Sequence, residues 1–176
     1  ESATHGYSHP VLTDMSAQSF EADLEKALSV TAPCTGQPIL GYRAPSFTIT
    51  DKTLWALDVL ARHGIKYDSS IFPVGFHPDY GISDAPLSIH ERGGLIEVPL
   101  SCADILGRRI PCSGGGYFRL FPYRLTTLLM RRCNHHGRPV IFYLHPWELD
   151  AGQPRMKLPR SKAFRHYCNL HKTERR

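Results

Sequence analysis

Apolar residues recur at the spacing of an amphipathic helix in three segments of the chain. In the first segment, residues 15–30, Ser16 stands where a helix N-cap is expected, because its hydroxyl can accept a hydrogen bond from a first-turn amide. The apolar face of this segment is formed by Phe20, Leu24, Ala27 and Leu28. We therefore predict a helix that begins directly after Ser16.

The second helical segment, residues 50–64, has Thr50 or Asp51 as its expected cap. Gly64 suits the position after its last turn, where a left-handed backbone is common. The third segment, residues 121–137, has a proline near its start and a glycine at its end, which is the usual asymmetry of helix ends.

Short apolar runs alternate with these helices and are predicted to be strands. They fall within residues 37–47, 65–73, 94–101 and 138–148. The last run is almost continuously apolar, as expected of a strand with both faces buried. Strands that alternate with helices of this length indicate βαβ units, so we predict an α/β fold with mainly parallel strands.

Polar residues follow three of the predicted strands. Arg43 follows the apolar run of residues 38–42, Asp68 follows the next predicted strand, and His145 follows the last one. In mainly parallel sheets the chemistry gathers at the carboxyl ends of the strands. We therefore expect these three residues to lie on one rim.

The composition is typical of a globular domain. The 176 residues are 41% hydrophobic and 21% charged, and this length predicts one domain over residues 1–176, with a basic extension from about residue 150. No apolar run reaches the roughly 18 residues of a membrane helix, so no membrane span is expected. The five cysteines contain no Cys-x-x-Cys pair and are expected to be free, buried thiols.

The net charge is +5, and positive residues are concentrated in residues 155–176. This stretch could bind a polyanion, or it could be a solvated surface helix. Aromatic residues interrupt the basic ones without forming a recognisable nucleic-acid module, which favours the surface helix and no nucleic-acid partner.

Residues 112–122 contain three consecutive glycines but lack the pattern of a phosphate-binding loop. Such glycines can let the backbone approach a ligand closely. Tyr117 and Phe118 then offer a flat apolar surface for a sugar ring, although aromatic residues are more often used in core packing.

His5 and His9 stand four residues apart in the opening sequence His-Gly-Tyr-Ser-His. On a helical turn, two imidazoles at this spacing project to the same side and could share a metal ion such as zinc. Spacing alone is weak evidence among 10 histidines, so ordinary surface histidines are the alternative. A metal site would also need a third ligand from elsewhere.

Each remaining candidate also has a structural alternative. His145 suits a general acid near neutral pH, or a core histidine bonded to the backbone. Arg43 suits bidentate pairing with a catalytic carboxylate, or a structural ion pair. Asp68 could tune a histidine or cap a turn. The residues alone leave these alternatives open.

The order of four motifs resembles the polysaccharide deacetylase family, the NodB-homology group of carbohydrate esterases. The motifs are His-Gly-Tyr-Ser-His, Tyr-Arg-Ala-Pro-Ser-Phe, Tyr-Asp-Ser-Ser-Ile-Phe-Pro and Phe-Tyr-Leu-His-Pro-Trp-Glu. The branch found in exopolysaccharide loci beside exosortase systems is the most similar, because Gly-Gly-Gly-Tyr-Phe-Arg-Leu and Phe-Arg-His-Tyr-Cys-Asn-Leu also look familiar there. The resemblance covers nearly the whole chain.

This resemblance implies an irregular (β/α) barrel with a divalent metal, zinc above all, at the strand carboxyl ends. His5 and His9 would be the metal ligands. Arg43 would hold the catalytic aspartate, His145 would be the general acid, and Asp68 would tune that histidine. The residues expected at the substrate are Leu144, which would line the acetyl-methyl pocket, Tyr117, Trp147 and Pro45.

The implied reaction is hydrolysis of N-acetyl groups on a hexosamine-containing polysaccharide or oligosaccharide, in exopolysaccharide biosynthesis or modification. The ion would activate water and polarise the amide carbonyl, and His145 would protonate the departing amine. The sequence departs from the family pattern, because no Asp pair precedes His5 to supply the base and the third ligand. We therefore expect an incomplete barrel without its N-terminal strands, weak metal binding and little hydrolysis by this truncated form.

Two competing functions remain on sequence grounds. One is a non-catalytic carbohydrate-binding relic of a deacetylase, which would bind acetylated glycan without releasing acetate. The other is a polyanion or membrane-surface binder that uses the basic C-terminal stretch and loses affinity steeply with salt. The expected compartment is the cytoplasm or the cell envelope of a bacterium, and the sequence predicts no oligomeric state.

Overall fold

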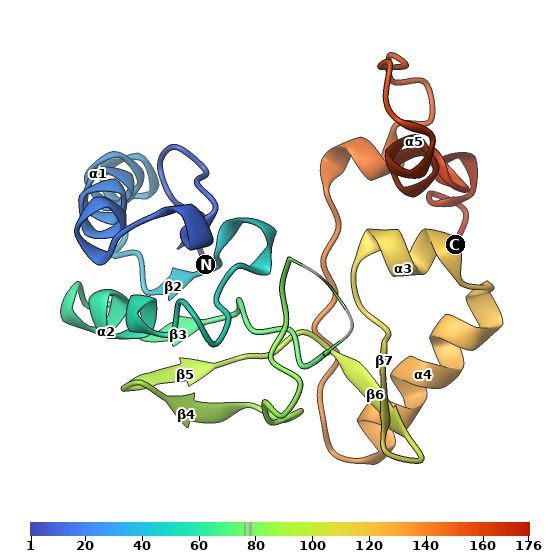
Figure 1. Cartoon of the computed structure of the whole chain (residues 1–176), viewed down its shortest axis with the longest axis horizontal. Coiled ribbons are helices and arrows are strands. Elements are labelled where there is room, and N and C mark those ends of the chain that lie inside the picture. Colours follow the sequence, from blue (N-terminus) through green and yellow to red (C-terminus); the bar gives the residue numbers. More distant parts are fainter. Residues whose placement is uncertain (76, 78) are drawn as a thin grey trace. The chain divides into compact units, whose positions relative to one another are not determined.

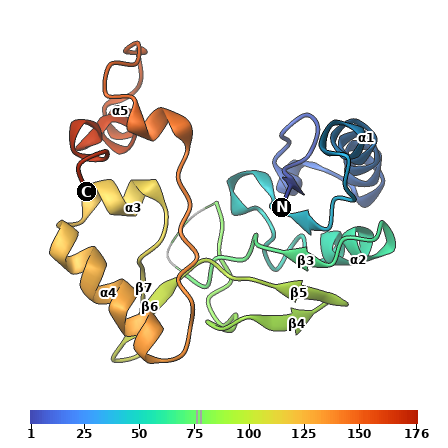
Figure 2. The same ribbon diagram turned by 180° about the vertical axis from the view of Figure 1, so that it is seen from behind.

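A computed structural model describes residues 1–75, 77 and 79–176 of the chain (Figures 1 and 2). The internal contacts gather into two compact units, Glu1–Leu100 and Ser101–Arg176. Each unit is described by itself below. The expectation of a single domain over residues 1–176 stays a prediction.

A five-stranded sheet organises the first unit, with the strand order β1-β2-β3-β5-β4 (Figure 1). The strands are β1 (Ala3–Thr4), β2 (Gly41–Tyr42), β3 (Tyr67–Asp68), β4 (His90–Arg92) and β5 (Leu95–Glu97). Neighbours from β1 to β5 are parallel, and only β4 runs antiparallel to β5 in this sheet. The expected α/β fold with mainly parallel strands is confirmed, and the described residues form no closed barrel.

The first predicted helix is α1 (Ala17–Thr35), and it begins as expected. Ser16 is its N-cap, and its hydroxyl accepts from the Ser19 amide at 3.2 Å. The Ser19 hydroxyl in turn accepts from the Ser16 amide at 3.0 Å. Two first-turn donors are therefore satisfied by two side chains, which fixes the start of the helix.

The second predicted helix, α2 (Trp55–Arg62), begins later than the sequence suggested. Residues 51–54 form a turn, in which the Thr53 hydroxyl donates to the Thr48 carbonyl at 2.6 Å and accepts from the Thr50 amide at 2.8 Å. The prediction of Thr50 or Asp51 as the cap is wrong, because these local bonds occupy the backbone of the turn. Leu54 is the N-cap, without a side-chain bond.

The core of the first unit lies between these helices and the sheet. Phe20 of α1 meets Tyr42 of β2 and Trp55 of α2 edge to face, with ring centroids 5.7 and 5.8 Å apart. The fully buried members of the core include Leu12, Leu24, Ile49, Leu60, Ile65, Ile71 and Ile82. This packing holds the ends of β1, β2 and β3 in place.

A tight hairpin joins β4 to β5. Gly93 and Gly94 connect the strands, with φ of +60° and +74°. Two consecutive left-handed residues are what a type I′ hairpin turn requires, and glycine adopts them without steric cost. The Gly-Gly pair is the sequence signal that would have revealed β4, which the hydrophobic pattern did not show.

The second unit is built on an antiparallel hairpin of β6 (Cys102–Ile105) and β7 (Arg108–Pro111). The third predicted helix, α4 (Tyr123–His135), packs on β6. Their buried contact consists of Ala103, Cys112, Leu129 and Cys133. All five cysteines of the chain are free, as predicted, although Cys34 is exposed and Cys168 is only half-buried.

The predicted strand within residues 138–148 is wrong. Residues 138–145 form an extended segment that joins no described sheet, and a short 3₁₀ helix, η3 (Pro146–Leu149), follows it. An apolar run becomes a strand only when a neighbour accepts its backbone hydrogen bonds. Here the Ile141 amide donates to the Ser101 hydroxyl at 2.7 Å instead of to a strand carbonyl.

Three short helices complete the second unit. They are α3 (Gly115–Leu120), α5 (Arg160–Tyr167) and the 3₁₀ helix η4 (Leu170–Lys172). None of the residues of α5 is buried, so this basic stretch contains the surface helix that the sequence favoured. No helix in the described part of the chain is long and apolar enough to cross a membrane.

Candidate active site

His5 and His9 face one another directly after β1. Their ring centroids are 4.8 Å apart at an interplanar angle of 73°, and both residues are exposed. The backbone between them is a loop, so the expectation of a helical turn is wrong. Gly6 and His9 are both left-handed, with φ of +80° and +55°, and this chain reversal brings the two rings together.

The loop between the two histidines is held by a carboxylate from α1. Asp23 accepts hydrogen bonds from the Tyr7 amide at 2.9 Å, the Ser8 amide at 3.0 Å and the Ser8 hydroxyl. Burial alone would raise the pKa of Asp23, but these hydrogen bonds outweigh it and leave the pKa below its usual range. Asp23 therefore fixes the loop as an ionised acceptor.

His5 also joins the first motif to the second. Its Nδ1 donates to the backbone carbonyl of Arg43 at 2.6 Å, and the Arg43 amide donates to the Thr4 carbonyl at 3.1 Å. With hydrogen on Nδ1, the lone pair of the ring is on Nε2, which is the atom that a metal takes. The pair fits two imidazole ligands of a zinc-type ion.

Among the residues that the structure describes, no further ligands for such an ion cluster with this pair. Within residues 1–75, 77 and 79–176, no group of three or more His, Cys, Asp or Glu side chains is arranged to hold a metal. The assignment of His5 and His9 as metal ligands therefore stays a prediction.

The guanidinium of Arg43 is bound by the loop that follows β3. Its Nε donates to the Ser69 carbonyl at 2.8 Å and its Nη2 to the Ser69 hydroxyl at 2.6 Å. The Ser69 hydroxyl donates onward to the Val98 carbonyl at 2.7 Å. This loop therefore sets the direction of the arginine side chain, and its role of holding a catalytic carboxylate stays a prediction.

The residues after Arg43 form a strained turn. Pro45 is buried at the start of the 3₁₀ helix η2 (Pro45–Phe47), and the Thr48 hydroxyl donates to its carbonyl at 2.7 Å. Ser46 and Phe47 both have a positive φ, of +54° and +56°. A bulky residue such as Phe47 rarely adopts this conformation, and strain of this kind is concentrated at functional loops.

Asp68 lies at the end of β3 and is fully buried. Its carboxylate accepts from the Ser70 amide at 3.1 Å and the Ser70 hydroxyl at 2.6 Å, which is the turn-capping arrangement. Ser70 also accepts from the Ala44 amide at 2.7 Å, so Asp68 supports the Arg43 motif indirectly. Its role as the acid that tunes His145 stays a prediction.

Glu97 is paired with Asp68 in the register of β3 and β5, and it is also buried. Burial raises the pKa of Glu97 to about 11, and the negative charge of Asp68 adds to the effect. Burial likewise raises the pKa of Asp68. Two buried carboxyl groups in contact cannot both ionise cheaply, so the pair shares a proton at neutral pH.

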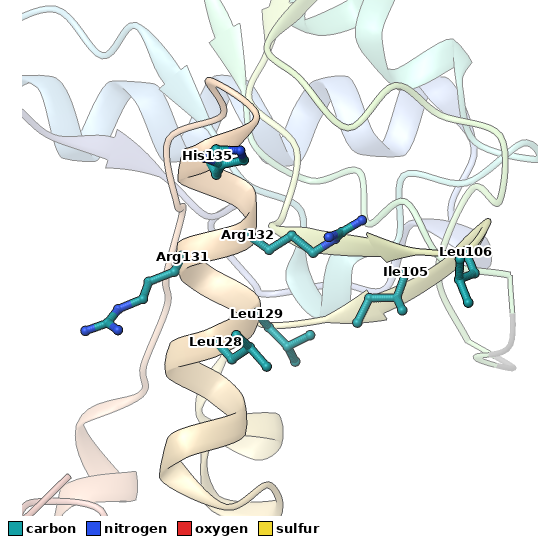
Figure 3. A pocket seen from close by; sticks show the side chains of 7 residues that line it. All are labelled: Ile105, Leu106, Leu128, Leu129, Arg131, Arg132 and His135. Carbon is teal, nitrogen blue, oxygen red and sulfur yellow. The ribbon is translucent and has the colours of Figure 1, made fainter.

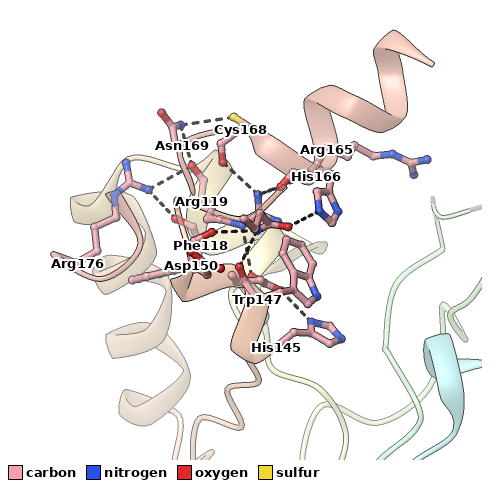
Figure 4. A network of polar contacts seen from close by, with 12 residues as sticks. Phe118, Arg119, His145, Trp147, Asp150, Arg165, His166, Cys168, Asn169 and Arg176 are labelled. Atoms are coloured by element: carbon pink, nitrogen blue, oxygen red, sulfur yellow. Dashed lines mark hydrogen bonds and ion pairs between the residues drawn. The ribbon is translucent and has the colours of Figure 1, made fainter. Parts of the chain in front are cut away.

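His145 stands at the start of η3 in the second unit, with a side chain that is 54% exposed. Its Nδ1 donates to Glu148 Oε1 at 2.8 Å (Figure 4). The other oxygen of the buried Glu148 carboxylate accepts from Arg119 Nε at 3.3 Å. His145 is thus an exposed imidazole supported by a buried ion pair, which is an arrangement suited to proton transfer.

The expected substrate residues Leu144, Tyr117 and Trp147 belong to the second unit. Leu144 precedes His145 and is 37% exposed, and Tyr117 lies half-buried on α3, 6.0 Å from Phe121 between ring centroids. One face of Trp147 is already covered, because His166 stacks on it at 4.2 Å with an interplanar angle of 8°. Their contacts with a glycan stay predictions.

The structure groups the candidates by unit. His5, His9, Arg43, Pro45 and Asp68 belong to Glu1–Leu100, with His5 in contact with His9 and Arg43. Tyr117, Leu144, His145 and Trp147 belong to Ser101–Arg176, with His145 stacked on Trp147 at 5.8 Å.

Sequence reasoning missed Arg119 and Glu97 as supporting residues, and it left Glu148 open between a carboxylate that supports His145 and a surface carboxylate. The spacing of His145 and Glu148 was a usable signal, because side chains three residues apart eclipse on a 3₁₀ helix. Glu97 was visible as an acid within an apolar strand. Nothing in the local sequence marks Arg119, whose partners lie 29 to 49 residues away.

An apolar pocket of about 440 Å³ lies between the β6–β7 hairpin and α4 (Figure 3). Its lining includes Ile105, Leu106, Leu128 and Leu129, and Arg131 points away from the hairpin. None of the candidate site residues lines it. Sugar recognition needs placed polar groups, so this pocket does not suit a glycan.

Comparison with known proteins supports the family that the motifs suggested. A family model described as a domain of unknown function, DUF3473, matches residues 69–176. "Peptidoglycan deacetylase" of Helicobacter pylori is 35% identical over 80 residues, which are 46% of this chain and 26% of that protein. "Peptidoglycan deacetylase-like protein FGM2" of Gibberella zeae is 34% identical over 71 residues, which are 40% of this chain and 20% of that protein.

The fold is also similar to a solved structure. A crystal structure named "putative polysaccharide deacetylase", from Mycobacterium smegmatis, aligns with a TM-score of 0.51 and 21% identity over 94% of this chain and 54% of that one. The resemblance to polysaccharide deacetylases is thereby confirmed. The family model matches more than half of the chain, so the chain belongs to the DUF3473 family. The chain spans about a quarter or less of the length of the curated relatives that it matches.

Proposed function

We propose that this chain carries the histidine pair and the general acid of a metal-dependent deacetylase that removes N-acetyl groups from a hexosamine-containing polysaccharide. The observation that carries the proposal is the placement of His5. Its ring faces His9 at 4.8 Å and is tied through Nδ1 to the Arg43 carbonyl, so two separate motifs of the family meet at one point. Surface histidines without a shared task have no reason to be ordered in this way.

A zinc-type ion, when bound, would polarise the acetyl carbonyl and activate water. The residues of the chain would supply the remaining functions. His5 and His9 would present Nε2 and a second imidazole nitrogen as ligands. Arg43, directed by Ser69, would orient a carboxylate, and His145 would give a proton to the departing amine nitrogen, which is otherwise a poor leaving group.

The rate expected of this chain is low. The described residues supply two imidazole ligands and no third ligand beside them. Removing a ligand or a general base from such a site typically costs about 100-fold or more in rate. We therefore expect weak zinc binding and slow, zinc-dependent acetate release.

The test is acetate release from a pentamer of N-acetylglucosamine during long incubations with zinc. His9→Ala should remove zinc-dependent release, and His145→Ala should lower it about 100-fold while the chain still binds zinc. His136→Ala is the matched control, because His136 is exposed and its Nδ1 donates to the carbonyl of Arg132 in its own helix.

Three outcomes decide between the functions. Zinc-dependent release that His9→Ala removes supports the deacetylase. Binding of the pentamer without any acetate release would favour the non-catalytic carbohydrate-binding relic. Glycan-independent binding to polyanions, with the steep salt dependence of phosphate contacts, would favour the basic C-terminal stretch as the functional surface.

A further inference from the structure

We propose that Glu148, supported by Arg119, positions His145 so that Nδ1 keeps its hydrogen and Nε2 is the atom that transfers a proton. This inference rests on the proposed function of His145 as the general acid. It adds two positioning residues that act through the histidine.

The local backbone places the two side chains together. His145 is the N-cap of η3 and Glu148 is three residues later, where side chains of a 3₁₀ helix eclipse. Glu148 Oε1 lies 2.8 Å from His145 Nδ1. Because a carboxylate can only accept, the hydrogen of this bond belongs to Nδ1, and the neutral ring carries its lone pair on Nε2.

The Glu148 carboxylate is held in place by a second charged side chain, Arg119. The side chains of Glu148 and Arg119 are each 3% exposed, and they meet at 3.3 Å. A buried carboxylate needs such a partner to remain charged. Arg119 also lies over the ring of Trp147, 5.3 Å from its centroid, so the ion pair is packed against the residue between His145 and Glu148.

Arg119 is itself held by the end of α5. Its Nη1 donates to the carbonyls of Arg165 at 3.3 Å, His166 at 2.8 Å and Cys168 at 3.1 Å (Figure 4). These carbonyls are among those that a helix leaves unpaired at its C-terminus, where a cation is also favoured by the helix dipole. The C-terminal stretch is therefore part of the support of the acid.

The glycine run makes room for the carboxylate. A Cβ at Gly115 would overlap the carboxylate of Glu148, whereas a Cβ at Gly116 would meet no atom within 4 Å. Gly115 does not have a positive φ, so its backbone conformation does not require glycine. The position requires glycine because a larger side chain has no room. One function of Gly115 is thus to admit the side chain that orients His145.

The proposed step moves one proton from His145 to the departing amine. The Nε2–H bond of the imidazolium breaks as an N–H bond forms on the departing amine nitrogen. The ring becomes neutral and keeps its Nδ1 hydrogen bond to the Glu148 carboxylate, whose charge does not change. The ion pair therefore holds the ring in one orientation during the transfer.

The tautomer of His145 can be read directly by long-range ¹H–¹⁵N NMR of the chain without metal or glycan. We expect the neutral ring to be protonated at Nδ1. Glu148→Ala and Gly115→Ala should both shift the tautomer towards hydrogen on Nε2, and Gly116→Ala should leave it unchanged. If the neutral His145 ring of the unmodified chain carries its hydrogen on Nε2, that result alone overturns the proposal.

Acetate release separates the positioning role from the proposed function. Glu148→Ala should lower zinc-dependent release about 10- to 100-fold with zinc binding unchanged. Release equal to that of the unmodified chain would overturn the positioning role. No release by the unmodified chain, with the Nδ1–H tautomer intact, would instead reject the proposed function.

Discussion

The Nδ1 of His5 donates a hydrogen bond to the backbone carbonyl of Arg43, with 2.6 Å between the two atoms. The bond joins the end of β1 to the end of β2, which are parallel neighbours in the sheet. It fixes both the tautomer and the plane of one member of the histidine pair. The acceptor is a backbone atom, so the identity of the Arg43 side chain does not affect this bond directly.

Removing the carboxylate that holds the histidine loop should weaken metal binding. In Asp23→Ala the Tyr7 and Ser8 amides lose their acceptor, and the loop no longer holds the two imidazole rings together. We expect the zinc affinity to fall about 10-fold, as is typical when a group that orients ligands is lost. Isothermal titration of the chain with zinc measures this.

The control for Asp23→Ala is Glu25→Ala, which removes an acid of the same helix. Glu25 is 63% exposed and does not bond to the loop. Equal loss of affinity in the two variants would show that general electrostatics, and not the loop, sets the affinity.

The shared proton of Asp68 and Glu97 should make the first unit less stable at high pH. The pKa of Glu97 is raised from 4.5 to about 11 in the folded chain, chiefly by burial. The folded state therefore keeps a proton that the unfolded state releases. Its stabilising effect is complete below pH 4.5 and is lost as the pH rises towards 11, by up to about 1.4 kcal/mol per pH unit.

Glu97→Gln should flatten this dependence, because an amide does not titrate. The measurement is urea denaturation at a series of pH values, followed by Trp55 fluorescence in a Trp147→Phe background. Glu91→Gln, at an exposed position of β4, is the control and should keep the slope of the unmodified chain. Identical slopes for Glu97→Gln and Glu91→Gln would contradict the shared proton.

The two neighbouring glycines of α3 should respond oppositely to substitution by alanine. Gly115→Ala pushes the buried Glu148 carboxylate from its site and should cost about 1–3 kcal/mol of the unfolding free energy. Gly116→Ala has open space around its Cβ and should be neutral, or stabilising by up to about 1 kcal/mol, because alanine favours helix. Denaturation followed by Trp147 fluorescence checks both. A tolerated Gly115→Ala would mean that the carboxylate can lie elsewhere.

The reactivity of the cysteine thiols should depend on their exposure to solvent and not on their pKa. The Cys112 thiol lies 3.6 Å from the Cys133 sulfur, and its hydrogen bond lowers the pKa of Cys133 to about 7. Cys133 is nevertheless buried, whereas Cys34 is exposed. We expect one fast-reacting thiol with a disulfide reagent, removed by Cys34→Ser. A fast phase that survives in Cys34→Ser and disappears in Cys133→Ser would contradict this.

Much of the parallel sheet and its helices could be predicted from the sequence. Ser16 fixed the start of α1 because capping is a local interaction, and the alternation of apolar strands with helices indicated parallel pairing. The extended segment at residues 138–145 was mistaken for a strand, because pairing depends on a neighbour and not on the segment itself. The β6–β7 turn was missed, since Leu106 takes a positive φ of +53° that its type does not announce.

The candidate site, like the fold, could be predicted from the sequence only in part. His5, His9 and Arg43 belong to contiguous motifs, and the sequence identified them, although it expected a helical turn where the structure has a loop. Asp23 and Arg119 act from other elements through hydrogen bonds over long sequence separations. Such contacts become visible only when the chain is folded.

Zinc binding by the histidine pair is the first property to measure. Isothermal titration with zinc is carried out on the unmodified chain, on His9→Ala and on His145→Ala. This one experiment separates the role of the histidine pair from that of His145. We predict one weak zinc site in the unmodified chain, its loss in His9→Ala and its retention in His145→Ala. Loss of the site in His145→Ala, or unchanged binding in His9→Ala, would contradict the assignment of His5 and His9 as ligands and of His145 as the acid.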